Sequence, residues 1–342
     1  MIRFLFLPLL LAVSGSLCFG QTAVTDASGR EIRSPAKVER VYAAGPPASL
    51  LVFAIAPDKL TGWTRAMRPN EAEFFPERYA NLPELGRLTG RGNTANVEVV
   101  LNAKTDLIVD VGSTGPTLAS LASQVQEQTR IPYSLFDGRI ESTPATLRAI
   151  GKLMGNEGPA EKLAAWYEHE VADVKQRVSR AKEHPLAYYG RSASGLQTGG
   201  KGSINVEALE VLGARNAAAE ARAGLVTVSF EQVLLWNPEV ILTTDPNFWN
   251  SVWTEPRWRA VRAVEQKRVY LSPHLPFGWF DFPPGANRLL GLWWAGKLLY
   301  PQSFADVDLR AKVTEFHRLF YHRDPTAAQL DALLGEPGVL AK

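Results

Sequence analysis

The feature that most constrains the fold is a short segment that occurs twice, 133 residues apart. Asn-Val-Glu-Val-Val-Leu begins at Asn96, and Ser-Phe-Glu-Gln-Val-Leu begins at Ser229. Each copy starts with a helix-capping residue, carries a glutamate in the first turn (Glu98 and Glu231) and leads into an apolar strand. Ordinary capping chemistry explains each copy by itself, but it does not explain why the unit occurs once in each half. The repeat therefore predicts a chain of two similar halves.

Strand and helix patterns alternate along both halves. Buried strands are expected at Val38–Ala43, Leu60–Thr64, Leu107–Val111, Tyr133–Phe136, Leu186–Tyr189, Val240–Thr243 and Val269–Leu271. Helical patterns are expected between them, at Ser49–Ile55, Val97–Ala103 and Thr117–Thr129. Strands that alternate with helices predict βαβ units and mostly parallel sheets.

A helical stretch separates the two halves. A first helix is expected over Thr143–Met154, and a second helix begins at Pro159 and continues to about Lys182, longer than an ordinary crossover helix. The expected fold class is α/β, with two Rossmann-like lobes joined by a single long α-helix and a ligand cleft between the lobes. The expected division is a signal peptide at 1–20, an N-terminal lobe at 21–141, a helical linker at 142–184 and a C-terminal lobe with terminal helices at 185–342.

The first twenty residues have the layout of a secretory signal. Arg3 precedes the apolar run Phe4–Val13, which is too short to span a membrane, and small residues follow it. Cleavage after Gly20 would remove Cys18, the one cysteine of the chain. A lipid anchor at Cys18 is not expected, because a lipoprotein signal has a small residue before the cysteine and this chain has Leu17. The mature chain is expected to be exported and to contain neither a disulfide nor a thiolate metal site.

Composition and motif spacing argue against several classes of function. With 37 Lys and Arg against 35 Asp and Glu, the net charge of +2 gives no reason to expect nucleic-acid or membrane-surface binding. No second apolar run is long enough for a membrane span. Gly195–Gly202 resembles a phosphate-binding loop but has Gly202 where the Mg²⁺-binding hydroxyl belongs. The five histidines have no metal-ligand spacing, so no catalytic residues and no protein-only metal site are expected.

Arginines follow several of the expected strands and turns. In an open α/β sheet, ligands bind beyond the carboxyl ends of the strands. The planar guanidinium group suits carboxylate and other anionic oxygens. We therefore expect an anionic ligand, with contacts among Arg65, Arg87, Arg91, Arg139 and Arg191.

Aromatic residues concentrate in residues 248–300, which hold 12 of the 33 Phe, Trp and Tyr residues of the chain. Part of this set has helical spacing and suits a core. The loop Phe277–Pro284 has no regular period and ends in two prolines, so its rings are suited to the wall of a ligand site. The aromatic ligand contacts expected are Trp249, Phe277, Trp279 and Phe280, and His274 is the one histidine that we consider as a further contact.

The order of these features resembles the metal-chelate substrate-binding proteins of ABC importers, the periplasmic proteins with a helical backbone that bind ferric siderophores, vitamin B12 and haem. The segments that carry the resemblance are Thr25–Arg30, Asn96–Glu98, Thr105–Val109, Ser229–Leu234 and Asn237–Ile241. The resemblance covers nearly the whole mature chain. It implies a rigid two-lobe clamp in the periplasm that holds a ligand between its lobes, without a cofactor and without enzymatic activity.

The resemblance also implies partners. Glu98 and Glu231 would be lobe-tip acids that meet arginines of a permease dimer, which works with an ATPase, and a two-fold permease gives the repeat a physical reason. The protein is expected to be a monomer that binds a small-molecule metal chelate, first of all a ferric siderophore-type complex. Cobalamin, haem (with Tyr188, Tyr189 or His274) and small nickel or oxyanion complexes remain alternatives, and an exported hydrolase is the alternative from a different class.

Overall fold

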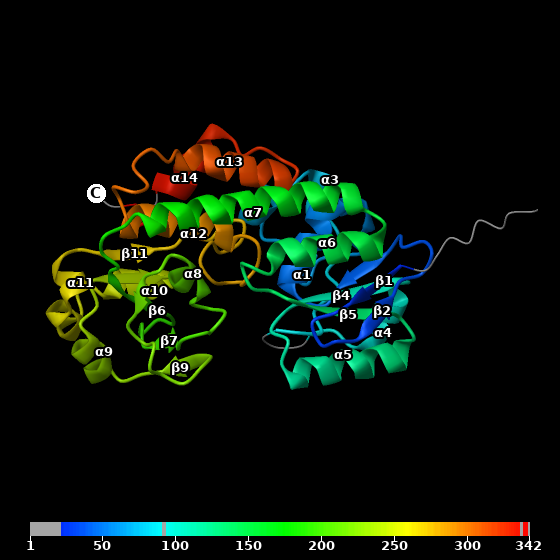
Figure 1. Ribbon diagram of the computed structural model, residues 1–342, viewed down its shortest axis with the longest axis horizontal. Coiled ribbons are helices and arrows are strands. Elements are labelled where there is room, and N and C mark those ends of the chain that lie inside the picture. The colour runs from blue at the N-terminus through cyan, green and yellow to red at the C-terminus, as the bar shows by residue number, and fades with distance from the viewer. Residues whose placement is uncertain (1–21, 91–93, 336–337, 341–342) are drawn as a thin grey trace, which may run out of the picture.

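The fold consists of two α/β lobes side by side, connected along one side by helices (Figure 1). The computed structural model describes residues 22–90, 94–335 and 338–340. The expected signal peptide, Cys18 included, and Arg91 lie outside these residues. Within the described ranges, none of the helices has both the length and the apolar character that crossing a membrane requires.

The N-terminal lobe is built on a parallel sheet in the order β3-β4-β5. Its sheet strands and main helices are β3 (Val41–Ala43), β4 (Leu107–Gly112), β5 (Tyr133–Asp137), α1 (Pro46–Ile55), α4 (Val97–Asn102) and α5 (Pro116–Thr129). Val41 and Leu107 pack toward α1, whereas Tyr42 and Ile108 pack toward α4 and α5. Because neighbouring strand residues point to opposite faces, these apolar residues cover the sheet on both sides.

Smaller elements complete this lobe. They are the antiparallel pair β1 (Ala23–Thr25) and β2 (Glu31–Arg33), a 3₁₀ turn (Pro57–Lys59), and the one-turn helices α2 (Pro69–Ala72) and α3 (Glu77–Ala80).

The C-terminal lobe is built on a parallel sheet in the order β11-β10-β6-β8. The strands are β6 (Leu186–Gly190), β8 (Arg215–Asn216), β10 (Val240–Thr243) and β11 (Val269–Leu271). The helices beside them are α8 (Glu207–Val211), α9 (Phe230–Trp236), α10 (Pro246–Ser251), α11 (Arg262–Glu265) and a 3₁₀ helix (Pro256–Ala260). An antiparallel pair, β7 (Gln197–Gly199) and β9 (Leu225–Thr227), lies at the edge of this lobe.

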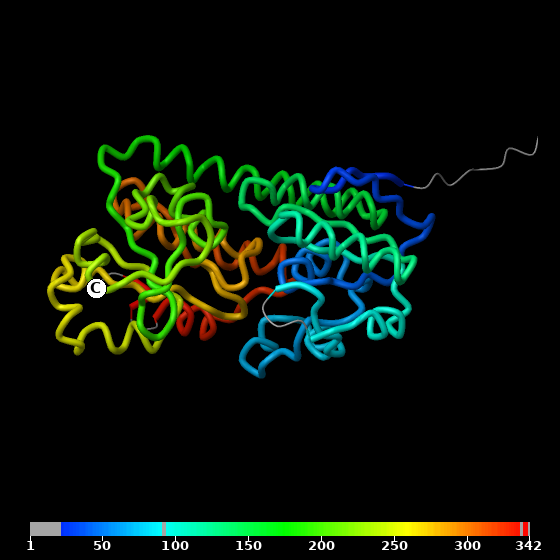
Figure 2. The backbone as a smooth tube through the Cα atoms, turned by 90° about the horizontal axis from the view of Figure 1, so that it is seen from below, coloured from blue at the N-terminus to red at the C-terminus, as the bar shows by residue number. Residues whose placement is uncertain are grey.

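Helices cover one side of both lobes in Figure 1, and Figure 2 shows the green α7 running from one lobe to the other. They are α6 (Thr143–Met154), α7 (Glu157–Ser179), α12 (Arg288–Leu299), α13 (Leu309–Phe320) and α14 (Ala327–Gly335). The 23-residue α7 runs along both lobes. The chain that follows α13 returns to the N-terminal lobe, where Nε2 of His322 lies 3.2 Å from the Phe53 carbonyl oxygen. The predicted α/β class and long connecting helix are confirmed, and the C-terminal segment adds a second connection.

Most of the predicted strands are confirmed, with two corrections. Leu60–Thr64 is not a strand, because its pairing is limited to isolated bridges from Leu60 to Val41 and from Trp63 to Glu84. The strand predicted to begin at Val38 begins at Val41. The backbone N–H groups of Glu39 and Arg40 donate to the carboxylate of Asp106, at 2.8 and 2.9 Å, instead of joining the sheet ladder.

The two copies of the repeat are capped helices, as predicted. The Asn96 side chain accepts a hydrogen bond from the Val99 N–H at 3.2 Å, and the Ser229 hydroxyl accepts one from the Gln232 N–H at 3.2 Å. Each cap satisfies a backbone donor that the first turn of a helix leaves free. The repeat therefore forms equivalent helices, α4 and α9, one in each lobe.

A buried ion pair connects the lobes close to the cleft. Arg288, at the start of α12, lies 2.7 Å from a carboxylate oxygen of Glu207 in α8. The same guanidinium group donates to the carbonyl oxygen of Gly138 in the N-terminal lobe, and the other Glu207 oxygen accepts from the N–H of Ile140 at 2.9 Å. Two C-terminal-lobe side chains thus hold the backbone of the N-terminal lobe, which restricts relative motion of the lobes.

His317 makes stability depend on pH. It is fully buried in α13, and neither ring nitrogen has a hydrogen-bond partner among the described residues. Burial lowers the pKa of His317 to about 3, so below pH ~6.5 the unfolded chain binds a proton that the folded chain cannot. The contribution of His317 to the free energy of unfolding is therefore fully present above pH ~6.5. It falls by ~1.4 kcal/mol per pH unit as the pH drops from ~6.5 to ~3.

Between pH 7 and pH 5 the free energy of unfolding should fall in both proteins. We expect the fall in the His317→Leu variant to be about 2 kcal/mol smaller than in the parent chain. Urea unfolding at both pH values measures this difference. The control is His169→Leu, at a residue that is exposed on α7. Equal pH dependence in the parent and the His317 variant would contradict the assignment.

Candidate functional site

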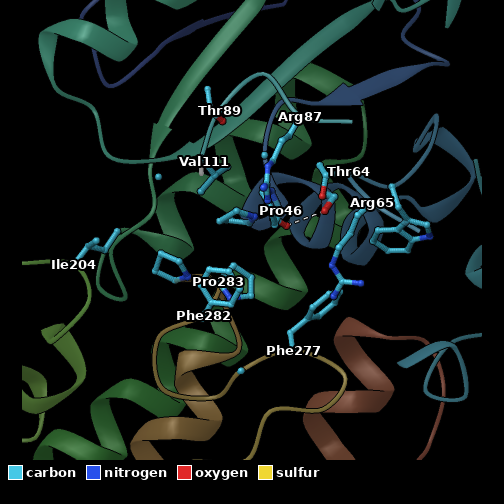
Figure 3. Close-up of a pocket in the computed structure, with 18 of the residues that line it drawn as sticks. Pro46, Thr64, Arg65, Arg87, Thr89, Val111, Ile204, Phe277, Phe282 and Pro283 are labelled. Carbon is cyan, nitrogen blue, oxygen red and sulfur yellow. Dashed lines mark hydrogen bonds between the residues drawn. The ribbon is translucent and has the colours of Figure 1, made fainter. Parts of the chain in front are cut away.

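A cavity of about 510 Å³ lies between the lobes, at the carboxyl ends of the sheet strands. Gly45 follows β3 and Ser113 follows β4 on one side, whereas Arg191 follows β6 and His274 follows β11 on the other. This is the place where open parallel sheets bind ligands, because several loops converge there. Figure 3 shows Arg87 and Thr89 facing Phe282 and Pro283 across this space.

One wall is formed by aromatic and prolyl side chains. Phe277, Phe282 and Pro283 come from the loop after β11, and Trp63 comes from the N-terminal lobe. The Phe277 ring contacts that of Phe75, with centroids 6.0 Å apart, so this loop also touches the opposite lobe. Rigid rings at a cavity wall bind apolar ligand surface at little cost in side-chain entropy.

A buried polar cluster fixes the loop after β11. Asp281 is fully buried and lies 2.8 Å from Nε of Arg191, and it accepts hydrogen bonds from the Tyr189 hydroxyl at 2.8 Å and the Asn205 amide at 2.6 Å. Burial raises the pKa of Tyr189, followed in importance by the charge of Asp281. At Gly291 of α12, an added Cβ would lie 2.1 Å from the Trp279 carbonyl oxygen. Any side chain at position 291 would therefore displace this loop. The cavity wall is thus pre-organised.

Arginines dominate the charged part of the lining. Arg65 forms a two-pronged ion pair with Glu71, at 2.7 and 2.8 Å, and the guanidinium of Arg68 lies near the same carboxylate at 4.0 Å. Burial alone would raise the pKa of Glu71, but hydrogen bonds from the Arg65 side chain and the Arg68 N–H outweigh it and keep the pKa below its ordinary value. One carboxylate therefore faces two cations, and Arg87 adds a further cation to the lining.

A second acid lies at the bottom of the N-terminal wall. Asp110 is almost fully buried and accepts hydrogen bonds from the Thr89 hydroxyl at 2.9 Å and the Tyr133 hydroxyl at 3.1 Å. Burial raises the pKa of Asp110 more than these hydrogen bonds lower it. A raised pKa makes the neutral carboxyl easier to reach here than in an exposed aspartate.

The start of α1 opens into the cavity. Gly45, Pro46 and Pro47 line it, and the N-cap position has no side-chain hydrogen bond. The positive end of a helix favours an anion, but prolines lack the N–H groups that would bind one. This end of the cavity therefore combines a favourable helix dipole with apolar ring surface.

The structure places four of the predicted ligand contacts at this cavity: Arg65, Arg87, Arg191 and Phe277. Trp279 and Phe280 are fully buried beneath the loop, and Trp249 packs against Trp253 and donates to the Val269 carbonyl oxygen. Arg139 is outside the lining and donates to the Gly202 carbonyl oxygen at 2.9 Å. Arg91 lies outside the described residues. As ligand contacts, all of these residues remain predictions.

Sequence reasoning missed several lining residues, among them Trp63, Arg68 and Phe282. Arg68 stands three residues after Arg65, and Phe282 lies in the predicted aromatic loop, so closeness in sequence to predicted contacts is the signal that indicates both. Trp63 gave no signal, because its segment was interpreted as a strand. Among the described residues, no group of three or more His, Cys, Asp or Glu side chains could hold a metal ion.

Known proteins resemble this chain along most of its length. The model of a family described as periplasmic binding protein matches residues 54–274. The molybdate-binding protein MolA of Haemophilus influenzae is 25% identical over 92% of this chain and 95% of its own length. The vitamin B12-binding protein of Vibrio cholerae is 24% identical over 70% of this chain and 82% of its own.

A solved structure agrees with this result. The ABC transporter solute-binding protein from Sulfurospirillum deleyianum superposes with a TM-score of 0.83 and 29% sequence identity, over 92% of this chain and 99% of that one. These relatives are solute-binding proteins and not enzymes.

Proposed function

Because this chain belongs to the periplasmic binding protein family, we propose that it binds an anionic metal chelate of the ferric siderophore type and delivers it to an ABC importer. The importer's permease and ATPase are the partners that the family implies. The metal is part of the cargo, so the chelator supplies its ligands and the protein recognises the outside of the complex.

The observation that carries this proposal is the lining of the cavity between the lobes. Its volume of about 510 Å³ suits a small organic ligand. Arg68 and Arg87 offer cationic donors, and Phe277 and Phe282 offer apolar rings. A chelate with anionic oxygens around the metal and an aromatic or aliphatic periphery matches both kinds of surface.

A bare oxyanion such as molybdate is the second candidate. The similarity to MolA over 92% of this chain and the opening of α1 into the cavity favour it. Against it, Pro46 and Pro47 remove two N–H groups from the first turn of α1, and an anion of this size would fill only a small part of the cavity.

Haem has less support. Tyr188 and Tyr189 are fully buried, and their hydroxyls donate to the Gly195 carbonyl oxygen and to Asp281. Neither lines the cavity, so of the three side chains considered as haem ligands, His274 is the one that lies there. The similarity to a vitamin B12-binding protein favours cobalamin as a further candidate, and micromolar binding of cobalamin without chelate binding in the titrations below would support it.

Delivery is proposed to use Glu98 and Glu231. Both are exposed, in the first turns of α4 and α9. Hydrogen bonds from its own N–H and from Ser229 lower the pKa of Glu231, which keeps this carboxylate charged. One carboxylate on each lobe fits a two-fold permease that offers a cation at two equivalent places.

We expect tryptophan fluorescence to be quenched at micromolar concentrations of an anionic ferric tris-catecholate, because Trp63 lines the cavity. Arg87→Gln should weaken this binding at least about tenfold, the size of one lost charge-assisted hydrogen bond. The same substitution should change the affinity for a neutral ferric trihydroxamate much less. Isothermal titration calorimetry on both proteins measures the two affinities.

The matched control is Arg180→Gln, at an exposed arginine that follows the last residue of α7 and does not line the cavity. It should bind the tris-catecholate like the parent chain. Micromolar binding of molybdate without chelate binding would favour the second candidate. Loss of affinity of equal size in both arginine variants would argue against a cationic cavity site.

A further inference from the structure

Large exposed apolar side chains are concentrated on the two helices of the repeat. In the described part of the chain, five large hydrophobic side chains are exposed: Leu101, Leu234, Leu235, Phe282 and Leu340. Phe282 belongs to the cavity wall. Three of the other four lie on α4 and α9, although together these helices are only 13 residues long. Scattered exposed leucines need no explanation, but a concentration on two equivalent elements does.

The two helices match in exposure as well as in sequence. Val100 and Val233 are equivalent positions and are both fully buried, so each anchors its helix to its lobe. Leu101 and Leu234 are also equivalent, and they are 47% and 40% exposed. The two helices thus share a buried valine and a half-exposed leucine, whereas the next position differs, with an exposed Leu235 in α9 and Asn102 in α4.

Each exposed leucine lies beside one of the repeated acids. Leu101 follows Glu98 by three residues, and Leu234 follows Glu231 by three residues. Side chains three apart on a helix are neighbours on one face. Both helices lie on the side of their lobe away from α7 (Figure 1). Each lobe thus presents a carboxylate and an apolar side chain as neighbours on one exposed helix.

The two chemistries contribute differently to an association. Exposed charges steer the encounter and set the salt dependence of the on-rate. Apolar side chains that leave water at the contact stabilise the complex once formed, and their loss appears mainly in the off-rate. A helix that presents a carboxylate beside a leucine is therefore suited to a partner that must be bound quickly and stay bound during transport.

We propose that Leu101 and Leu234 are the apolar anchors of the surface that docks on the permease dimer, with Glu98 and Glu231 as its charged guides. The inference rests on the proposed function and deepens it. The partner would present two equivalent sites related by a two-fold axis, each an apolar depression beside a cationic side chain. The equivalence of the two leucines is what a partner with two identical sites requires.

The test uses the full exported protein and the permease–ATPase complex of the importer that it serves, held in lipid nanodiscs. The variant is Leu101→Gln with Leu234→Gln, since glutamine keeps the side-chain length and helix propensity. Surface plasmon resonance should show a dissociation constant at least about tenfold weaker, mainly from a faster off-rate. The salt dependence of the on-rate should stay that of the parent chain, and so should quenching by the ferric tris-catecholate.

Two controls complete the experiment. Leu340→Gln changes another exposed leucine, outside α4 and α9, and should dock like the parent chain. Glu98→Gln with Glu231→Gln should lower the on-rate and its salt dependence instead of raising the off-rate.

Three outcomes would overturn the inference. If the leucine variant leaves the permease at the parental rate, the leucines are not anchors, while the proposed function stands. If the parent chain binds the chelate but no permease, the proposed function fails and the inference fails with it. If sedimentation shows a parental dimer that the leucine variant lacks, the surface joins two copies of this chain instead.

Discussion

A chain carrying Glu98→Lys and Glu231→Lys is expected to lose transport by at least about a hundredfold while its ligand affinity stays unchanged. Both carboxylates are exposed in the first turns of α4 and α9 and lie outside the cavity lining, so the ligand site is untouched. In the proposed docking, reversing them places like charges against the permease, and each such contact costs several kcal/mol. Uptake of iron-55 from the ferric tris-catecholate into reconstituted proteoliposomes measures the loss.

The control for this prediction carries the same change of net charge elsewhere. Glu77 in α3 and Glu315 in α13 are exposed acids near the connecting helices, far from α4 and α9 in Figure 1. Glu77→Lys with Glu315→Lys should transport normally. Parental uptake by the Glu98 and Glu231 variant, or equal losses in both variants, would refute the docking assignment.

Arg288→Met is expected to lower the free energy of unfolding by about 3–5 kcal/mol, the range for a buried ion pair that loses one partner. Arg288 is fully buried, and its 2.7 Å contact with Glu207 is supported by a hydrogen bond to the Ile204 carbonyl oxygen at 2.9 Å. Without the arginine, Glu207 keeps the N–H of Ile140 as a donor but has lost its counter-charge. Urea unfolding at pH 7.5 measures the change.

A double-mutant cycle separates the ion pair from packing. Adding Glu207→Gln to Arg288→Met removes the uncompensated charge, so the double variant should be more stable than the single arginine variant. If the two substitutions simply add their losses, or if Arg288→Met loses less than about 1 kcal/mol, the ion pair is not what holds the lobes together.

Most helices and strands could be predicted because each is determined by the residues of its own segment. The runs Leu107–Val111, Val240–Thr243 and Val269–Leu271 are apolar at nearly every position, as strands buried on both faces require, and they are strands. The helix predicted over Thr143–Met154 has the predicted ends, because Pro144 starts it and Gly155 takes the left-handed conformation after it. The boundaries at 141 and 184 stay a prediction, since one apolar core runs through both lobes.

The lining of the site was less predictable, because tertiary contacts decide it. Phe277 and Trp279 are two residues apart, yet one lines the cavity and the other is buried. The chain turns directly after Phe277, where the Gly278 N–H donates to the Phe282 carbonyl oxygen at 3.0 Å, and no local pattern encodes that turn. Arg191 was predicted from its place after a strand, but its ion pair with Asp281 joins residues 90 positions apart.

The most direct test of the account is to locate bound iron in crystals of the protein with the ferric tris-catecholate, by anomalous X-ray scattering at the iron edge. We predict a single iron peak in the cavity between the lobes, with the chelator contacting Arg87 and the ring of Phe277, and with no protein atom bound to the metal. An iron peak outside this cavity, or iron held directly by protein side chains, would contradict the central claim.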